Sequence, residues 1–201
     1  MALIRRTFFY FCSAPRLIHK RCAQAQKLVY KQLNEEAILK EMSIKGRFAF
    51  AMRCLELLLD KERDIDKPIV QRILAQLWSY TKSDRLDDWE EEVFAFDPQL
   101  QAVDIEEFSS PAKKEIEEIR EYYLTASETV RELISAIISI GRDNLYAATI
   151  DYSKSTLTPT VRVMNLTQEV VGRIPDVESF RKFAFSDRDG WGISFGREDV
   201  S

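Results

Sequence analysis

The apolar residues of this chain recur at helical spacing almost throughout its 201 residues, and this spacing constrains the fold more than any other feature. The clearest stripe advances by steps of four, three and four through Phe48, Met52, Leu55 and Leu59. Residues at such steps share one face of a helix, and that face must be buried against a neighbouring element. Alternation with a period of two is limited to a weak pattern at residues 160–164. The sequence therefore predicts an all-α fold.

Glycine, proline and capping residues divide this pattern into separate helices. A first helix is expected at about residues 21–42, with Gly46 as its breaker. Asp66 precedes a first turn that contains a proline, so we expect it to cap the helix that follows. Thr125 and Glu128 have the spacing of a capping box, in which the hydroxyl and the carboxylate each accept a free backbone amide.

The second half of the chain contains similar signals. Gly141 is expected to end or bend a long apolar helix, and residues 143–152 are expected to form a further helix. Thr158 and Pro159 combine a capping residue with a proline, which predicts a helix start. Gly172 follows the last apolar residues of that helix and is expected to stop it in a left-handed conformation.

Together these segments predict an irregular bundle of about seven or eight helices around one core. A composition that is 45% hydrophobic, with six Gly and six Pro, excludes a disordered or low-complexity chain. The longest apolar runs, such as residues 133–140, fall far short of the roughly 18 residues that a membrane span needs. We expect one helical domain at residues 21–201, preceded by a basic arm or extra helix at residues 1–20.

Charge is distributed unevenly along the chain, although the net charge is only −4. Residues 1–34 contain seven Lys or Arg and no acidic residue. Such a start is compatible with a cleavable transit peptide, with part of a twin-arginine export signal, or with an ordinary basic first helix or an upstream start site. The apolar stretch at residues 8–12 is too short for an export signal. We favour the ordinary helix or upstream start, with an organelle-targeted helical protein as the alternative.

The segment at residues 84–121 is acidic, with fourteen acidic and four basic residues and a net charge of −10. A negative surface repels the phosphates of nucleic acids and attracts basic proteins. We therefore expect no nucleic-acid partner and a protein partner that contacts exposed carboxylates of this segment. The candidate contact residues are Asp84, Asp87, Asp88, Glu90, Glu91 and Glu92, followed by Asp104, Glu106 and Glu107.

Motifs for catalysis and for cofactor binding are scarce. The sequence has no G-x-G-x-x-G, P-loop, H-E-x-x-H or G-x-S-x-G motif, and its single histidine excludes a site with several histidine ligands. Its three cysteines are widely spaced and form no C-x-x-C pair. We therefore expect no enzyme activity, no cofactor and no metal. The alternative is a carboxylate–metal enzyme, because Asp84, Asp88 and Glu91 would share one face of a helix.

Trp89 lies inside the acidic run and has two interpretations. An exposed tryptophan among charges can anchor a protein partner. Alternatively, Trp89 packs into the core, because it shares a helical stripe with Val93 and Phe96. We favour the core, since the stripe continues over two helical turns.

Three stretches of the chain together resemble a known family. They are KGRFAFAMRCLE at residues 45–56, LYAA at residues 145–148, and IPDVESFRKF at residues 174–183, followed by FS at residues 185–186 and DGWG at residues 189–192. In this order they are similar to small helical immunity proteins of bacterial polymorphic-toxin and contact-dependent inhibition systems. The resemblance covers roughly residues 40–197, and the Pro-Asp, Phe and Gly-Trp-Gly residues near its end are its sharpest part.

The resemblance implies a non-catalytic antitoxin that binds a cognate toxin domain, often a nuclease, and blocks its active site or the surface that it needs. Immunity proteins diverge at their binding faces, so the resemblance assigns no contact residue. It implies that Gly190 and Gly192 permit a turn, while Trp191 and Phe180 cover the end of the bundle. We therefore expect a cytoplasmic immunity protein that neutralises its toxin through an acidic helical surface.

Overall fold

The computed structural model describes residues 26, 30, 32–100, 110–143, 145 and 151–200, and these residues form an all-α fold. Seven α-helices are present among them, with no β-strand and one isolated bridge between Met42 and Ala184. The predicted irregular helical bundle is thereby confirmed. The chain separates into two compact units, Met1–Ala37 and Ile38–Ser201, and the core lies in the second. The predicted boundary at residue 20 and the basic start with its possible transit peptide lie outside the described residues.

The helices follow one another with short links. After a helix at residues 32–41 come α2 (Ile44–Glu62), α3 (Pro68–Lys82), α4 (Leu86–Val93), α5 (Ser110–Thr125), α6 (Glu128–Arg142) and α7 (Lys154–Val171). Short 3-10 helices follow α4 at Phe94–Phe96 and Pro98–Leu100. The C-terminal segment contains three more, at Val177–Phe180, Asp187–Gly190 and Arg197–Asp199.

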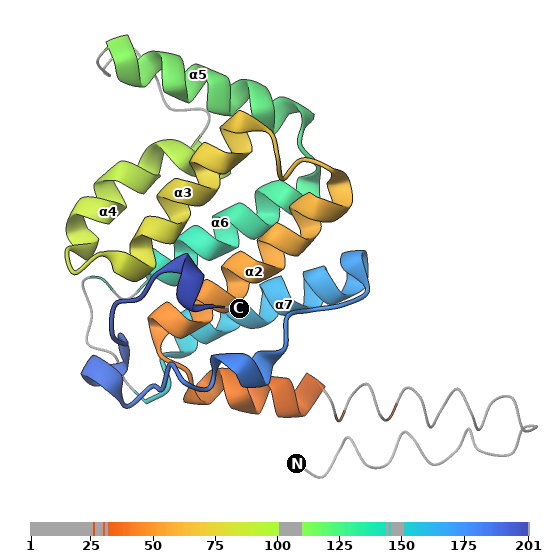
Figure 1. The fold of residues 1–201 in the computed structure, drawn as a ribbon, viewed down its shortest axis with the longest axis vertical. Helices are drawn as coiled ribbons and strands as arrows, with labels where there is room; N and C mark the ends of the chain where they lie inside the picture. Colours follow the sequence, from red (N-terminus) through yellow and green to blue (C-terminus); the bar gives the residue numbers. More distant parts are fainter. Residues whose placement is uncertain are drawn as a thin grey trace, which may run out of the picture. The chain divides into compact units, whose positions relative to one another are not determined.

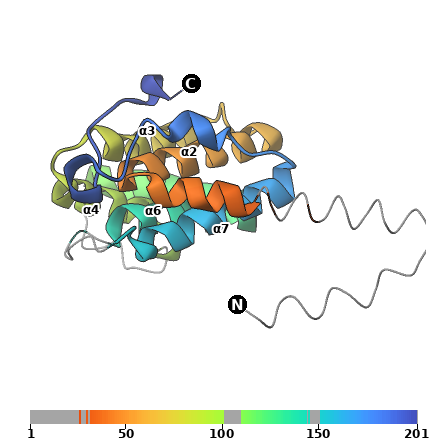
Figure 2. The same ribbon diagram turned by 90° about the horizontal axis from the view of Figure 1, so that it is seen from below.

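Three helices, α2, α6 and α7, pack against one another at the centre of the bundle (Figure 1). Helix α3 lies against α2, and α4 lies against α3 and α6. Figure 2 shows the C-terminal segment on the side of α2 and α3, with α6 and α7 on the opposite side. Every residue of α2 from Ile44 to Met52 is buried, so this half of the helix is enclosed by its neighbours. Among the described helices, none is long and apolar enough to cross a membrane.

The break before α2 falls at residues 42–43 rather than at Gly46, so the predicted breaker is wrong. Ser43 is the N-cap, and its hydroxyl accepts a hydrogen bond from the backbone amide of Gly46 at 3.2 Å. Gly46 itself lies in the first turn of the helix. A Cβ atom there would stand 2.8 Å from the Cβ atom of Phe183. Glycine is therefore needed for close packing of the C-terminal segment and not for ending a helix.

The C-terminal segment closes this break with backbone hydrogen bonds. The amide of Ser43 donates to the carbonyl of Phe183 at 2.9 Å, and the amide of Lys45 donates to the carbonyl of Trp191 at 3.1 Å. The first turn of a helix leaves amides without an intrahelical acceptor. Segments distant in the sequence supply those acceptors here, so the start of α2 and residues 183–191 stabilise each other.

Arg47 is fully buried and holds three segments together. Its Nε atom donates to the carbonyl of Leu39 at 2.8 Å, and a terminal nitrogen donates to the carbonyl of Lys40 at 3.1 Å. The other terminal nitrogen donates at 2.9 Å to both the carbonyl of Ser153 and the hydroxyl of Thr156. Desolvation by burial lowers the pKa of this guanidinium to about 10. One side chain of α2 thus fixes the end of the preceding helix and the start of α7.

Two further helix starts lie one or two residues beyond their predicted caps. Helix α3 is capped by Lys67 rather than Asp66, with Pro68 as the first helical residue and no side-chain cap bond. Helix α6 is capped by Ser127, whose hydroxyl accepts a backbone amide of the first turn, while Thr125 ends α5. Ser127 satisfies the capping rule as well as Thr125 does, whereas Lys67 occupies the cap position of α3 without a side-chain bond, so the sequence locates each boundary but not its cap.

Helix α7 begins at Lys154 and encloses Pro159, so the predicted helix start at Thr158 is wrong. An internal proline lacks one intrahelical amide and costs roughly 3 kcal/mol relative to alanine. Packing of α7 against both α2 and α6 outweighs this cost. The stop at Gly172 is confirmed, because that residue has a φ of 85° and ends the helix.

The predicted helix at residues 143–152 is not formed by its described residues, since Asp143, Leu145, Asp151 and Tyr152 lie in turns. Helix α6 ends at Arg142, one residue beyond Gly141, close to the predicted end. The turn predicted near the C-terminus is present, with positive φ at Gly190 and Gly192.

Replacing Arg47 with Lys should lower the free energy of unfolding by about 2–4 kcal/mol, because one ammonium cannot satisfy several separate buried oxygens. Chemical denaturation followed by circular dichroism measures this loss. The matched control is Arg131→Lys at an exposed position of α6, which should change the free energy by less than about 0.5 kcal/mol. A loss below about 1 kcal/mol for Arg47→Lys would contradict the role of the guanidinium.

Candidate functional site

Helix α4 carries the predicted acidic run, with one face buried and the other exposed. Trp89 is 2% exposed and Val93 is fully buried. Trp89 therefore belongs to the core, as the helical stripe predicts, and is not an exposed anchor for a partner. The opposite face presents four exposed carboxylates, those of Asp87, Asp88, Glu91 and Glu92.

Trp89 packs α4 against the core through contacts with two other aromatic rings. Its indole packs edge-on, with ring centroids 4.8 Å from Tyr80 and 5.8 Å from Phe48, and its Nε1 atom donates to the carbonyl of Gln76 at 3.2 Å. Gly141 of α6 leaves room for this ring, since a Cβ atom there would stand 2.6 Å from its Cη2 carbon. The packing of Trp89 therefore determines where the exposed carboxylates of α4 lie.

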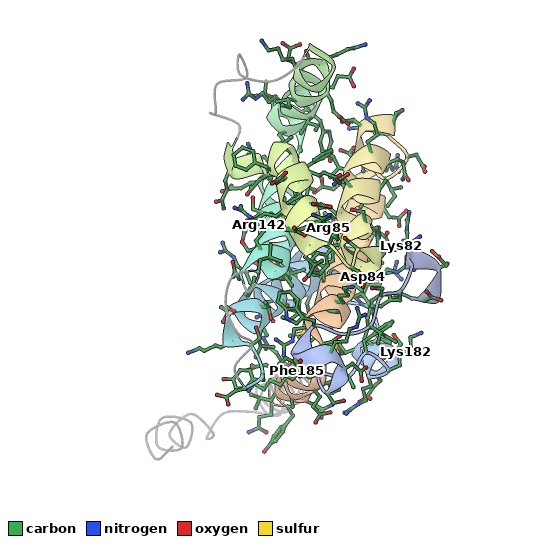
Figure 3. All side chains as sticks on the ribbon, turned by 90° about the vertical axis from the view of Figure 1, so that its left-hand side faces the viewer. Lys82, Asp84, Arg85, Arg142, Lys182 and Phe185 are labelled. Carbon is green, nitrogen blue, oxygen red and sulfur yellow. The ribbon has the colours of Figure 1, made fainter. Side chains whose placement is uncertain are left out.

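Two residues of the acidic run connect α4 to its neighbouring helices. Glu90 is half-buried and accepts a hydrogen bond at 3.0 Å from Nε of Arg142 on α6. Figure 3 labels Arg142 together with Arg85 and Asp84. Glu92 accepts a hydrogen bond from the side-chain amide of Gln76 on α3 at 3.0 Å. These bonds fix the orientation of α4 about its axis, and they make Glu90 the least available of the candidate contacts on α4.

Arg85 lies at the start of α4 and neutralises part of the acidic face. Its guanidinium donates to Asp88 at 2.7 Å and to Asp87 at 3.2 Å. The hydrogen bond from Arg85 lowers the pKa of Asp87, and the same contact raises the pKa of Arg85. All three side chains are more than half exposed, so solvent screens these pairs and they add little to stability. A basic group from a partner can therefore replace Arg85 at little cost.

Asp84 precedes α4, so it does not share a helical face with Asp88 and Glu91 as the metal-site alternative requires. Its Oδ1 atom accepts hydrogen bonds from Arg188 at 2.8 Å and from the hydroxyl of Ser194 at 2.9 Å. These bonds, chiefly the one from Arg188, lower the pKa of Asp84. Within the described part of the chain, no group of three or more His, Cys, Asp or Glu side chains is placed to hold a metal ion.

A hollow of about 390 Å³ lies beside the start of α4, and we call it the α4 hollow. At its floor Lys45 of α2 is 2% exposed, and its Nζ atom donates to the carbonyl of Ser83 at 2.9 Å and to the hydroxyl of Ser194 at 2.8 Å. Burial lowers the pKa of Lys45. The lining residues come from distant parts of the chain: Lys45, Ser83, Asp84, Leu86, Asp87, Leu145, Arg188, Trp191 and Gly192.

Sequence reasoning identified Asp84 and Asp87 but missed Lys45, Arg188 and Ser194. No local spacing joins these residues, because the path of the C-terminal segment brings them together. One signal was present in the sequence. Between residues 44 and 52, all positions apart from Lys45 are apolar, glycine or the equally buried Arg47, so a buried cation could have been expected.

The remaining candidate contacts, Asp104, Glu106 and Glu107, lie outside the described residues. Comparison of the chain with family models, with curated proteins and with solved structures finds no match in any of the three.

Replacing Gly141 with Ala should lower the free energy of unfolding by about 1–3 kcal/mol, although alanine is the better helix former by up to about 1 kcal/mol. The added methyl group would displace the Trp89 ring and with it α4. Thermal or chemical denaturation measures the change, with Ser139→Ala on the same helix as a control expected within about 0.5 kcal/mol of the parent. Unchanged or increased stability would mean that α4 does not depend on this contact.

Proposed function

We propose that this chain is an immunity protein that binds and neutralises a bacterial toxin domain, with the outer face of α4 as part of its contact surface. The observation that carries the proposal is the exposed row of Asp87, Asp88, Glu91 and Glu92 on a helix whose inner face is fixed in the core. Carboxylates on a rigid element attract a basic partner and lose little conformational entropy when it binds.

The chemistry of this face favours a basic protein over a nucleic acid. Phosphates would be repelled by four exposed carboxylates, of which only two are paired with Arg85. A domain that itself binds nucleic acid carries a basic surface for the same electrostatic reason. A toxin that cleaves nucleic acid is therefore the kind of partner that this face fits best.

The stretches that resemble immunity proteins support the proposal in a second way. Gly46 and Arg47 in the first stretch, and Phe183 and Trp191 in the third, make the contacts that close the break before α2. Such roles are structural and leave the surface of α4 free to vary. The proposal places the protein in the cytoplasm, where it would intercept the toxin, and requires no catalytic step.

The test begins with the C-terminal domain of the protein encoded beside this gene. Co-expression of that domain with the chain should restore growth if the chain is its immunity protein. Charge reversal at α4 with Asp87→Lys, Asp88→Lys and Glu91→Lys should slow association at low salt by at least roughly tenfold, because electrostatic attraction acts mainly on the association rate. Surface plasmon resonance at two salt concentrations measures this effect.

A matched control carries the same change in net charge on another helix. Glu115→Lys, Glu117→Lys and Glu121→Lys reverse three exposed carboxylates of α5. This control should associate with the toxin domain at nearly the parent rate. Equal association rates for the α4 variant and the parent would remove α4 from the contact surface, and a failure of the chain to restore growth would contradict the proposed function itself.

A further inference from the structure

Lys45 is a buried cation that has no carboxylate bonded to its ammonium. Among the described residues its hydrogen-bond acceptors are the carbonyl of Ser83 and the hydroxyl of Ser194, both of them neutral. An ammonium has three N–H groups, so one remains for a further acceptor. A buried charge is costly unless a counter-charge lies beside it. The charge of Asp84 acts on this ammonium, but its Oδ1 atom is bonded to Arg188 and Ser194, so the floor of the α4 hollow lacks a carboxylate bonded directly to Lys45.

Arg188 adds a second cation at the rim of the same hollow. One of its terminal nitrogens donates to Asp84, and the side chain is 59% exposed. A guanidinium has five N–H groups in a planar fork, so donors remain beyond this one bond. Arg188 is also held in a left-handed conformation, with a φ of 46° and a ψ of 53°, and Asp189 follows it with a φ of 54°. Non-glycine residues in that conformation are strained, and such residues are enriched at binding sites.

The two cations of the hollow, Lys45 and Arg188, outnumber the lining carboxylates that are available to them. Asp84 is shared between Arg188 and the hydroxyl that Lys45 also contacts, while Asp87 is bonded to Arg85. Asp84 is thus the one lining carboxylate that offsets the charges of both Lys45 and Arg188. The other lining side chains include the apolar Leu86, Leu145 and Trp191, which can contact the carbon chain of a bound group.

We propose that the α4 hollow binds a carboxylate group, held by the ammonium of Lys45 and the guanidinium of Arg188. A carboxylate adds one negative charge and matches the planar fork of an arginine. A phosphate is a poorer fit, because its second negative charge would meet Asp84 and Asp87. The carboxylate is that of an Asp or Glu side chain of the toxin domain, an assignment that rests on the proposed function, whereas the carboxylate site does not.

This site would make the contact surface recognise both signs of charge. The outer face of α4 attracts basic groups, and the adjacent hollow accepts one acidic group. A surface of this kind discriminates between partners better than a uniformly acidic one, since a partner with the wrong pattern leaves charges unpaired.

The test uses sodium phenylacetate, a small carboxylate with an aromatic body, titrated into the isotope-labelled full chain at constant ionic strength. Two-dimensional NMR should show saturable shifts at the amides of Lys45 and Ser194 and at the indole of Trp191. For a ligand of this size we expect a Kd of the order of 10 mM. Phenyl phosphate should bind more weakly, and benzylamine should cause no saturable shift at these positions.

Two variants connect the binding to the named cations. Arg188→Gln should weaken phenylacetate binding by about tenfold, as expected for one lost charged hydrogen bond. The matched control, Arg162→Gln, removes an exposed arginine of α7 that is likewise bonded to one carboxylate, at 2.7 Å, and should bind like the parent. Lys45→Met should abolish binding, with its circular dichroism spectrum confirming the fold.

The inference is overturned if phenylacetate causes no saturable shift up to about 100 mM, a concentration well above the expected Kd. Equal binding by Arg188→Gln and the parent, or stronger binding of benzylamine, would also overturn it. None of these results would affect the proposed function, which depends on α4. A toxin domain that binds Arg188→Gln as tightly as the parent would overturn the assignment of the carboxylate to the toxin.

Discussion

The guanidinium of Arg47 is the interaction on which the arrangement of the bundle depends. It lies in the first turn of α2 and donates hydrogen bonds to four oxygen atoms, three of them backbone carbonyls from the end of the preceding helix and the start of α7. It also faces the ring of Phe185 at 5.4 Å, so the C-terminal segment belongs to the same assembly. Because a buried cation tolerates little rearrangement of its acceptors, the end of helix 32–41, the start of α7 and residues 183–191 are fixed relative to α2.

The candidate site is a consequence of that arrangement. The C-terminal segment, held at the start of α2, brings Arg188 and Trp191 beside Asp84 and the buried amine of Lys45. On the other side, Trp89 inserts between α3 and α6 and turns the carboxylates of α4 outward. A short helix of eight residues has little stability of its own, so its orientation comes from these tertiary contacts.

The sequence predicted the helices well where one physical signal dominated. The stripe through Phe48, Met52, Leu55 and Leu59 and the stripe through Trp89 and Val93 are both buried, because hydrophobic burial decides which face of a helix turns inward. Helix starts were less predictable, since Ser43 and Ser127 compete with other polar neighbours for the capping position, and packing overrides the helix-breaking tendency of Pro159. The hollow could not be predicted, because it joins residues 45, 84 and 188, whose proximity depends on the path of the whole C-terminal segment.

We propose that the acidic face of α4 and the adjoining hollow contact a toxin domain. Hydrogen–deuterium exchange of the chain, alone and with the C-terminal domain of the protein encoded beside its gene, tests this proposal most directly. We expect slower exchange on binding in Leu86–Val93 and at residues 187–194, with α5 unchanged. Protection confined to α5 or to the face of α6 and α7, with α4 exchanging as in the free chain, would contradict it.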